Sequence, residues 1–319
     1  MTYFLRRLVT FPLIMLGVSI LVFVAIRLIP GDAITAMLGT ESGLLTPAQR
    51  ASLAAYFGID QNWFVQYGRW IWGVVQGDFG LSTTFGRPVL DVIGDRFPMT
   101  LQLAVMSLVI ALIIGLPAGI YAATRQDRLS DIILRIVAMI GQSTPNFVIG
   151  LVIIYILSAG FGILPVMGRP VRFLDDPLGS LAQLSLPALI LGFSFAASVT
   201  RISRSSMLDV LGEDYVRTAR AKGVKRRNVI WKHALRNALI PVVTLSGVEF
   251  GYLLGGAVIV EQIFALPGLG RVVLEAIGQR DYAMVQGSIL FIALNFLVVN
   301  LLVDLLYVAL DPRIRLEGR

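Results

Sequence analysis

Six long apolar runs dominate the 319-residue chain and limit what it can fold into. They cover residues 8–29, 101–124, 132–158, 181–200, 238–260 and 284–310. A helix that crosses the hydrocarbon core of a bilayer needs about 20 consecutive, mostly apolar residues. The sequence therefore predicts an all-α polytopic membrane protein with about six transmembrane helices.

The composition agrees with a membrane protein and excludes several other classes. Charged residues make up 15% of the chain, whereas a soluble domain has about a quarter. The net charge is +7, but the cations fall between apolar runs, so we expect no nucleic-acid partner. The chain has no cysteine and a single histidine, His233, which excludes disulfides, thiolate metal sites and histidine clusters.

Lysine and arginine are distributed unevenly between the segments that join the runs. With the N-terminus inside, the inside segments hold 18 of the 27 cations, ten of them between Arg201 and Arg236. Cytoplasmic loops carry such an excess because these cations resist translocation. We therefore expect both termini in the cytoplasm. The first run follows Arg6 and Arg7 and is too long for a signal peptide, so we expect it to remain as a membrane anchor.

This topology divides the chain into four segments. They are an N-terminal transmembrane helix at 1–30, an extracytoplasmic segment with short helices at 31–98, a transmembrane core at 99–310 that includes a cytoplasmic loop at 201–237, and a cytoplasmic tail at 311–319. In the second segment, Thr46 as N-cap, Pro47 in the first turn and Gly58 at the end predict a short helix.

Aromatic and aliphatic side chains then recur at helical spacing. They are Trp63, Phe64, Tyr67, Trp70, Ile71 and Val74. This pattern is typical of a helix lying along the outer membrane interface, and equally of a small aromatic core beneath a loop.

Prolines and glycines interrupt the apolar runs. Four prolines remove a backbone donor within or near the end of a predicted helix: Pro117, Pro145, Pro187 and Pro241. In the fifth run, Gly247, Gly251 and Gly255 repeat every four residues and predict a face that another helix can approach closely.

Glu249 is the clearest ionisable residue inside a predicted span. A charge at the bilayer centre costs at least about 2.5–3.5 kcal/mol, so such residues usually face protein or water. Glu249 either lines a solute path or makes a protonated or hydrogen-bonded helix contact. Asp304 lies near the cytoplasmic end of the last run, where we expect a structural role.

The sequence lacks the residues for several kinds of chemistry. It has no G-x-x-x-x-G-K-[ST] phosphate loop, so if ATP drives transport another chain must bind it. The segment PGLGR, Pro267–Arg271, is predicted to be a turn outside the membrane. No G-x-S-x-G motif is present, and an enzyme is not expected. An ion-gradient-driven secondary transporter is the main alternative to an ATP-driven one.

The most basic stretch, EDYVRTARAKGVKRRNVIWKHALRNALIP, joins the fourth and fifth runs. Glu213 to Lys222 is predicted to form a short helix. The acidic side chains of Glu213 and Asp214 suit the positive N-terminal end of the helix dipole, and Glu213 can pair with Arg217 four residues on. Gly223 is typical of the residue that ends a helix. A second helical run is expected from about Val224 to Leu239. Such a surface helix, held between two spans, can transmit a push into the membrane.

The chain resembles the permease subunits of binding-protein-dependent ABC importers in the dipeptide and oligopeptide permease family, of the first-permease type. The resemblance extends over nearly the whole chain through segments in the same order: FLRRL with IPGD, GDFGLS, RISRSSMLDVLGEDY, the basic stretch, EQIFALPGLGR, RDYAMVQG and NLLVDLLYVALDPRIR.

The resemblance implies the type I ABC importer permease fold in a bacterial inner membrane. It implies four kinds of partner: a second homologous permease subunit, two cytoplasmic ATPases that bind ATP and Mg, an extracytoplasmic solute-binding protein, and the lipid bilayer. This chain would bind no cofactor itself. In such permeases the loop helix docks on the ATPase. The residues that match this docking segment are Glu213, Asp214, Tyr215, Arg217, Ala219, Ala221, Lys222 and Gly223.

The sequence departs from the family pattern in two places. The general loop motif has Glu-Ala-Ala where this chain has Arg217, Thr218 and Ala219. Glu249 stands where many relatives have a neutral polar residue, which suggests a preference for cationic solutes. The solute implied by the resemblance is a peptide; nickel, glutathione and sugar or opine-like conjugates are the alternatives.

Overall fold

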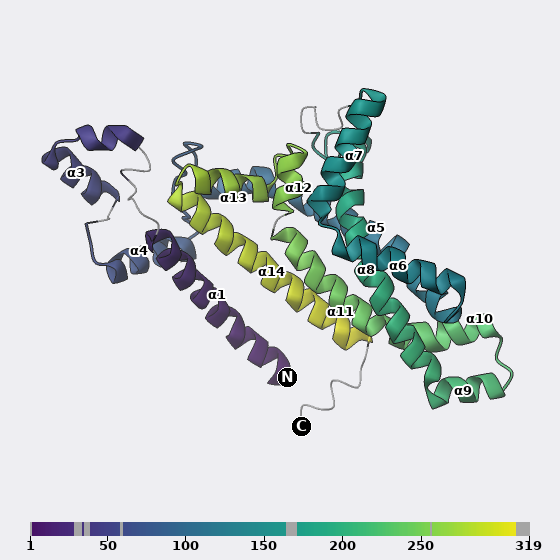
Figure 1. The fold of residues 1–319 in the computed structure, drawn as a ribbon. Coiled ribbons are helices and arrows are strands. Elements are labelled where there is room, and N and C mark those ends of the chain that lie inside the picture. Colours follow the sequence, from purple (N-terminus) through teal and green to yellow (C-terminus); the bar gives the residue numbers. More distant parts are fainter. Residues whose placement is uncertain are drawn as a thin grey trace. The chain divides into compact units, whose positions relative to one another are not determined.

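The computed structural model describes residues 2–28, 34, 39–57, 60–163, 171–255 and 257–310. Apart from an isolated bridge between Leu81 and Pro88, the regular structure of these residues is helical. The chain forms two compact units. Figure 1 labels most of the helices that belong to them. Unit 1 combines residues 1–98 with 267–297, and unit 2 combines 99–266 with 298–319. Residues 267–297, grouped with the transmembrane core in the sequence, thus pack with the N-terminal segment.

Unit 1 contains the helices α1 (Thr2–Leu28), η1 (Gly39–Leu44), α3 (Pro47–Phe57), α4 (Trp63–Val75) and α13 (Leu269–Gly278), with the first parts of α5 (Val89–Thr124) and α14 (Tyr282–Leu310). Its core is apolar and includes Val22, Ile26, Val89, Ile93, Leu269, Val272 and Met284. Thr46 and Gln49 cap α3 reciprocally, because Gln49 N–H donates to Thr46 Oγ1 and Thr46 N–H donates to Gln49 Oε1. The predicted stop at Gly58 lies outside the described residues.

Unit 2 contains the rest of α5 and α14 with α6 (Leu129–Ser143), α7 (Asn146–Phe161), α8 (Pro177–Gly212), α9 (Asp214–Ala221), α10 (Arg226–Asn228), η2 (Val229–Ala234), α11 (Leu235–Leu254) and α12 (Val258–Ile263). Helices α5 and α8 approach closely at Gly115 and Gly119. A Cβ atom built on Gly115 would lie 2.6 Å from the Ala196 carbonyl oxygen, and one on Gly119 would lie 2.6 Å from that of Thr200. These glycines therefore set the spacing of the two helices.

Among the described residues, five helices are long and apolar enough to cross a membrane, and the count rises to six if one bent pair is a single span. The third predicted span is that pair: α6 and α7 meet at 96°, so a straight helix over 132–158 is wrong. The bend falls at Thr144 and Pro145, where proline lacks the N–H that would continue α6 and instead caps α7. Helices α5, α8 and α11 continue through Pro117, Pro187 and Pro241.

The segment Pro267–Arg271 is not wholly a turn, because α13 begins at Leu269 with Gly268 as its N-cap. Glycine at 268 leaves an extended backbone before the helix, and the apolar side chains of Leu269 and Val272 are buried in the core of unit 1. This burial favours a helix where the local sequence alone suggests a turn.

Candidate functional site

Helix α9 is a short helix at one end of unit 2, between α8 and α10. Glu213 is its N-cap, and Asp214 lies in its first turn, where an acidic side chain is favoured by the helix dipole. The predicted pairing of Glu213 with Arg217 is wrong: Arg217 Nη1 lies 3.5 Å from Asp214 Oδ1 instead. Both side chains are largely exposed, so this pair contributes little stability. The charges of α9 remain accessible to another molecule.

The predicted stop at Gly223 is confirmed, and its geometry is a Schellman turn. The Gly223 N–H donates to the Arg220 carbonyl at 2.9 Å, and the Val224 N–H donates to the Ala219 carbonyl at 3.2 Å. Gly223 has a φ of +75°, a left-handed conformation that glycine adopts without a Cβ clash. The turn reverses the chain directly after α9.

Two side chains of α9 hold it against the rest of unit 2. Val216 is fully buried. The Tyr215 hydroxyl donates to the His233 carbonyl at 3.3 Å and accepts from Asn237 Nδ2 at 2.8 Å. Because His233 belongs to η2 and Asn237 to α11, α9 is joined to the helix that continues into a membrane span.

The segment after the turn is also held to α5. Arg226 Nη2 donates to the carbonyl of Thr124, the last residue of α5, at 3.0 Å. A cation at this position also suits the negative end of the helix dipole. The expected second helical run is confirmed from Arg226 onward, but its six residues from Val229 to Ala234 are π-helical. Such segments are often found at functional positions.

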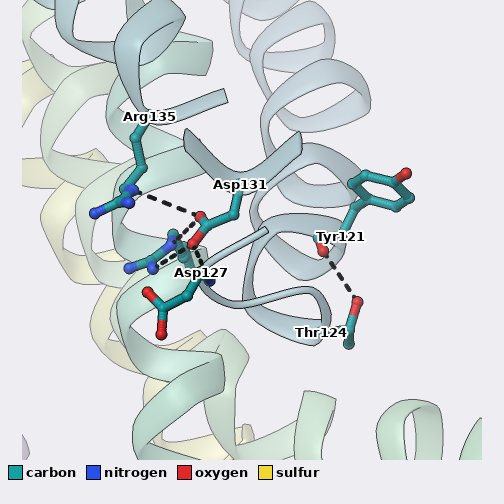
Figure 2. A network of polar contacts seen from close by, with 6 residues as sticks. Tyr121, Thr124, Asp127, Asp131 and Arg135 are labelled. Atoms are coloured by element: carbon teal, nitrogen blue, oxygen red, sulfur yellow. Dashed lines mark hydrogen bonds and ion pairs between the residues drawn. The ribbon is translucent and has the colours of Figure 1, made fainter. Parts of the chain in front are cut away.

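A buried ion pair fixes the neighbouring ends of α6 and α8 (Figure 2). Asp131 is inaccessible to solvent, and its carboxylate accepts from Arg204 Nε at 2.6 Å and Nη2 at 2.8 Å. It also accepts from the Asp127 backbone N–H at 3.0 Å, and Arg135 Nε lies 3.7 Å away. Removing one member of such a pair leaves an uncompensated buried charge. The pair therefore holds the loop before α6 in one conformation.

The structure places the predicted docking residues together and leaves most of them accessible. Val216 faces inward, whereas Glu213, Asp214, Arg217, Ala221 and Lys222 are exposed on α9 and its turn, and Ala219 is half-buried. Sequence reasoning missed the Asp131–Arg204 pair, because its members lie 73 positions apart. It also missed the contribution of Asn237 and Arg226 to holding this loop.

The predicted intramembrane residues lie elsewhere on α11. Glu249 is half-buried and lies 14 residues after Leu235, about 20 Å along the helix, so it is not part of the α9 site. A Cβ atom on Gly247 would overlap the Val303 side chain of α14, which shows close packing of α11 and α14 there. Gly251 is buried, and Gly255 is the C-cap of α11.

Comparison with known proteins identifies the family. Residues 115–316 match the model of the binding-protein-dependent transport system inner membrane component, and residues 1–104 match the model of its N-terminal region. The chain is 41% identical to the dipeptide transport system permease protein DppB of Escherichia coli K12, over 98% of both chains. It is 42% identical to the glutathione transport system permease protein GsiC of the same strain, over 99% of both chains.

A solved structure shows the same fold. A chain of the inward-facing MetNI methionine ABC transporter matches with a TM-score of 0.54 and 17% identity, covering 69% of this chain and 96% of that one. The helical architecture and this match show the type I ABC importer permease fold. The family models and the permease relatives support an ATP-driven importer and not the alternative of an ion-gradient-driven transporter. The chain belongs to the family of inner membrane components of binding-protein-dependent transport systems.

Proposed function

We propose that this permease subunit imports small peptides or peptide-like solutes, such as a dipeptide or a tripeptide of the glutathione type. The observation that carries the proposal is the match to dipeptide and glutathione permeases at 41% and 42% identity over almost the entire chain. Its partners would be a second homologous permease, two ATPases that bind ATP and Mg, and a solute-binding protein. Hydrolysis of ATP would take place on the ATPases, and this chain would have no catalytic activity of its own.

We place α9 and its turn against the ATPases. Arg217 and Lys222 offer positive charge on an exposed surface, and Asp214 offers negative charge beside them. Tyr215 joins α9 to η2 and α11, and Val216 anchors it, so a push on α9 would reach a membrane span. This arrangement would put α9 and both termini of the chain in the cytoplasm.

Reconstitution tests the function. The permease pair, the ATPases and the binding protein would be placed in liposomes with ATP inside, and uptake of labelled dipeptide and glutathione would be measured. We expect uptake that requires ATP and the binding protein and continues without an ion gradient. Uptake by the permease alone on an ion gradient would contradict the proposal.

Gly223→Pro tests the contact of α9 with the ATPases. Proline requires a negative φ and has no N–H. It therefore removes the hydrogen bond from residue 223 to the Arg220 carbonyl and changes the backbone conformation at the end of α9. We expect the assembled complex to hydrolyse ATP while uptake falls at least about tenfold. A tenfold fall corresponds to a rise of about 1.4 kcal/mol in the activation free energy of the transport step. Gly223→Asn, which tolerates the left-handed conformation, is the matched control. Normal uptake by the proline variant would contradict this role.

Glu249 is proposed to line the path of the solute. It lies half-buried on a helix that is apolar enough to span the membrane. Glu249→Gln removes the charge and keeps the size, so uptake of cationic peptides should fall relative to neutral peptides. Equal uptake ratios in the two proteins would assign Glu249 to a helix contact.

A further inference from the structure

Helix α4 lies across α1. The contacts pair Gln66 with Arg27, Tyr67 with Ser19, and both Tyr67 and Trp70 with Phe23. Arg27 donates to Gln66 Oε1 from Nε at 3.0 Å and from Nη2 at 2.8 Å, and the Ser19 and Tyr67 hydroxyls are 2.8 Å apart. The contacts cover about 12 Å along α1 but little more than one turn of α4. Helix α4 therefore crosses α1 and does not run alongside it.

The crossing lies in the C-terminal half of a helix long and apolar enough to span the membrane. Because α1 would run through the bilayer, a helix that crosses it near its end lies close to the plane of the membrane. Arg27, in the last turn of α1, is the kind of residue that marks the edge of the hydrocarbon core. Figure 1 shows α4 beside the C-terminal end of α1. The level of α4 thus matches the interface between headgroups and acyl chains.

The face of α4 that points away from α1 is apolar and exposed. Phe64, Trp72 and Val75 are 85%, 63% and 72% exposed, and with Gly68 they follow one another at helical spacing along one strip. Within α4 the one charged residue is Arg69, at the edge of this strip. The other face supplies the small aromatic cluster of Tyr67 and Trp70 against Phe23. The aromatic core that the sequence suggested therefore lies on the face toward α1, and the interpretation as a membrane-interface helix concerns the exposed face.

We propose that the strip of Phe64, Gly68, Trp72 and Val75 is inserted in the lipid bilayer at the level of the headgroup–acyl boundary. Tryptophan is enriched at that level because its ring is apolar and its indole N–H can meet the polar region. Exposure of the same strip to water would leave a row of large apolar side chains with almost no charge around it. The position beside the end of a spanning helix makes lipid, and not a protein partner, the expected occupant.

The test uses the absence of native cysteine from this chain. Phe64→Cys and Trp72→Cys would be made separately, labelled with a nitroxide, and studied by electron paramagnetic resonance in the assembled complex with cysteine-free partners. The complex would be held in nanodiscs of phosphatidylethanolamine and phosphatidylglycerol. Both positions point away from α1, so the substitutions leave the contacts of α4 with α1 intact. Ser52→Cys, on the exposed polar part of α3, is the matched control.

We expect the ratio of oxygen to water-soluble nickel-complex accessibility to be several-fold higher at 64 and 72 than at 52, because oxygen concentrates in the acyl region and the nickel complex stays in water. A water-like ratio at 64 and 72 would overturn the proposal. Exclusion of both reagents would also overturn it, since the strip would then be covered by protein. A loss of both accessibilities on addition of the binding protein would identify that protein as the occupant.

Discussion

The ends of α9 and α13 have the same backbone geometry but are stabilised differently. At the end of α13, the Arg280 N–H donates to the Ile277 carbonyl at 3.2 Å and the Asp281 N–H donates to the Ala276 carbonyl at 2.8 Å. This is the same Schellman turn that follows α9. The left-handed residue is Gly223 after α9 and Arg280, with a φ of +55°, after α13. A residue with a Cβ costs about 1–2 kcal/mol in this conformation.

The buried carboxylate of Asp281 compensates for that cost. Its Oδ2 accepts from the Ser82 hydroxyl and, at 3.0 Å, from the Thr84 N–H, and its Oδ1 accepts from the Met284 N–H at 3.0 Å. Asp281 therefore ends the turn, caps α14 and holds the segment around Ser82 at the same time. Both left-handed residues are exposed, but the residue that follows Gly223 is Val224, which is half-buried and has no polar side chain, whereas Asp281 is fully buried. The glycine turn therefore forms without a buried polar group next to its left-handed residue, whereas the arginine turn is held by hydrogen bonds from Ser82 and Thr84 to Asp281.

Asp281→Ala is expected to give the largest effect. It removes three hydrogen bonds and leaves the Ser82 hydroxyl, which is buried, without its acceptor, so we expect a loss of about 3 kcal/mol in the stability of unit 1. The measurement is the unfolding midpoint of the purified complex. Asp281→Asn is the matched control, because asparagine still caps α14 and should lose less. Equal losses in the two variants would show that the contacts of the second carboxylate oxygen with Ser82 and Thr84, and not the cap of α14, account for the stability.

The contrast also explains what the sequence could and could not predict. Gly223 ends α9 through its own backbone freedom, so a local pattern suffices to find it. Arg280 gives no local signal, because its turn depends on Ser82 and Thr84, almost 200 positions away. Asp131 and Arg204 are missed for the same reason.

Hydrophobic runs identify the spans well, since length and apolarity are local properties. The 96° bend between α6 and α7 is less predictable, because Pro117, Pro187 and Pro241 occur within continuous helices while Pro145 does not. Gly115 and Gly119 form a G-x-x-x-G pattern, which is a local signal for close helix packing. The sequence therefore contained this signal, although only the glycines of α11 were predicted to pack closely.

Gly223→Ala is expected to have a smaller effect than Asp281→Ala. Alanine adds a Cβ in the left-handed conformation, which costs about 1–2 kcal/mol, while no atom lies within 4 Å of the position the Cβ would take. The cost is therefore conformational and not steric. The unfolding midpoint of the complex should fall slightly, and amide hydrogen exchange should rise selectively in α9. An unchanged exchange rate in α9 would show that the contacts that Tyr215 and Val216 make with the rest of unit 2, and not the turn, hold this helix.

Arg280→Gly should give the smallest effect, and with the opposite sign. Glycine relieves the left-handed cost of about 1–2 kcal/mol but adds about 0.5–1 kcal/mol of unfolded-chain entropy, so the net gain in stability is about 0.5 kcal/mol. Arg280→Ala retains the Cβ and removes the guanidinium, and so it separates conformational relief from loss of charge. A gain in the glycine variant alone, seen as a raised unfolding midpoint, would mean that Asp281 holds the chain in a conformation that its own sequence disfavours. A gain in both variants would instead assign the cost to the exposed guanidinium. The turn after α13 would then be disfavoured by the charge of Arg280 and not by its left-handed backbone.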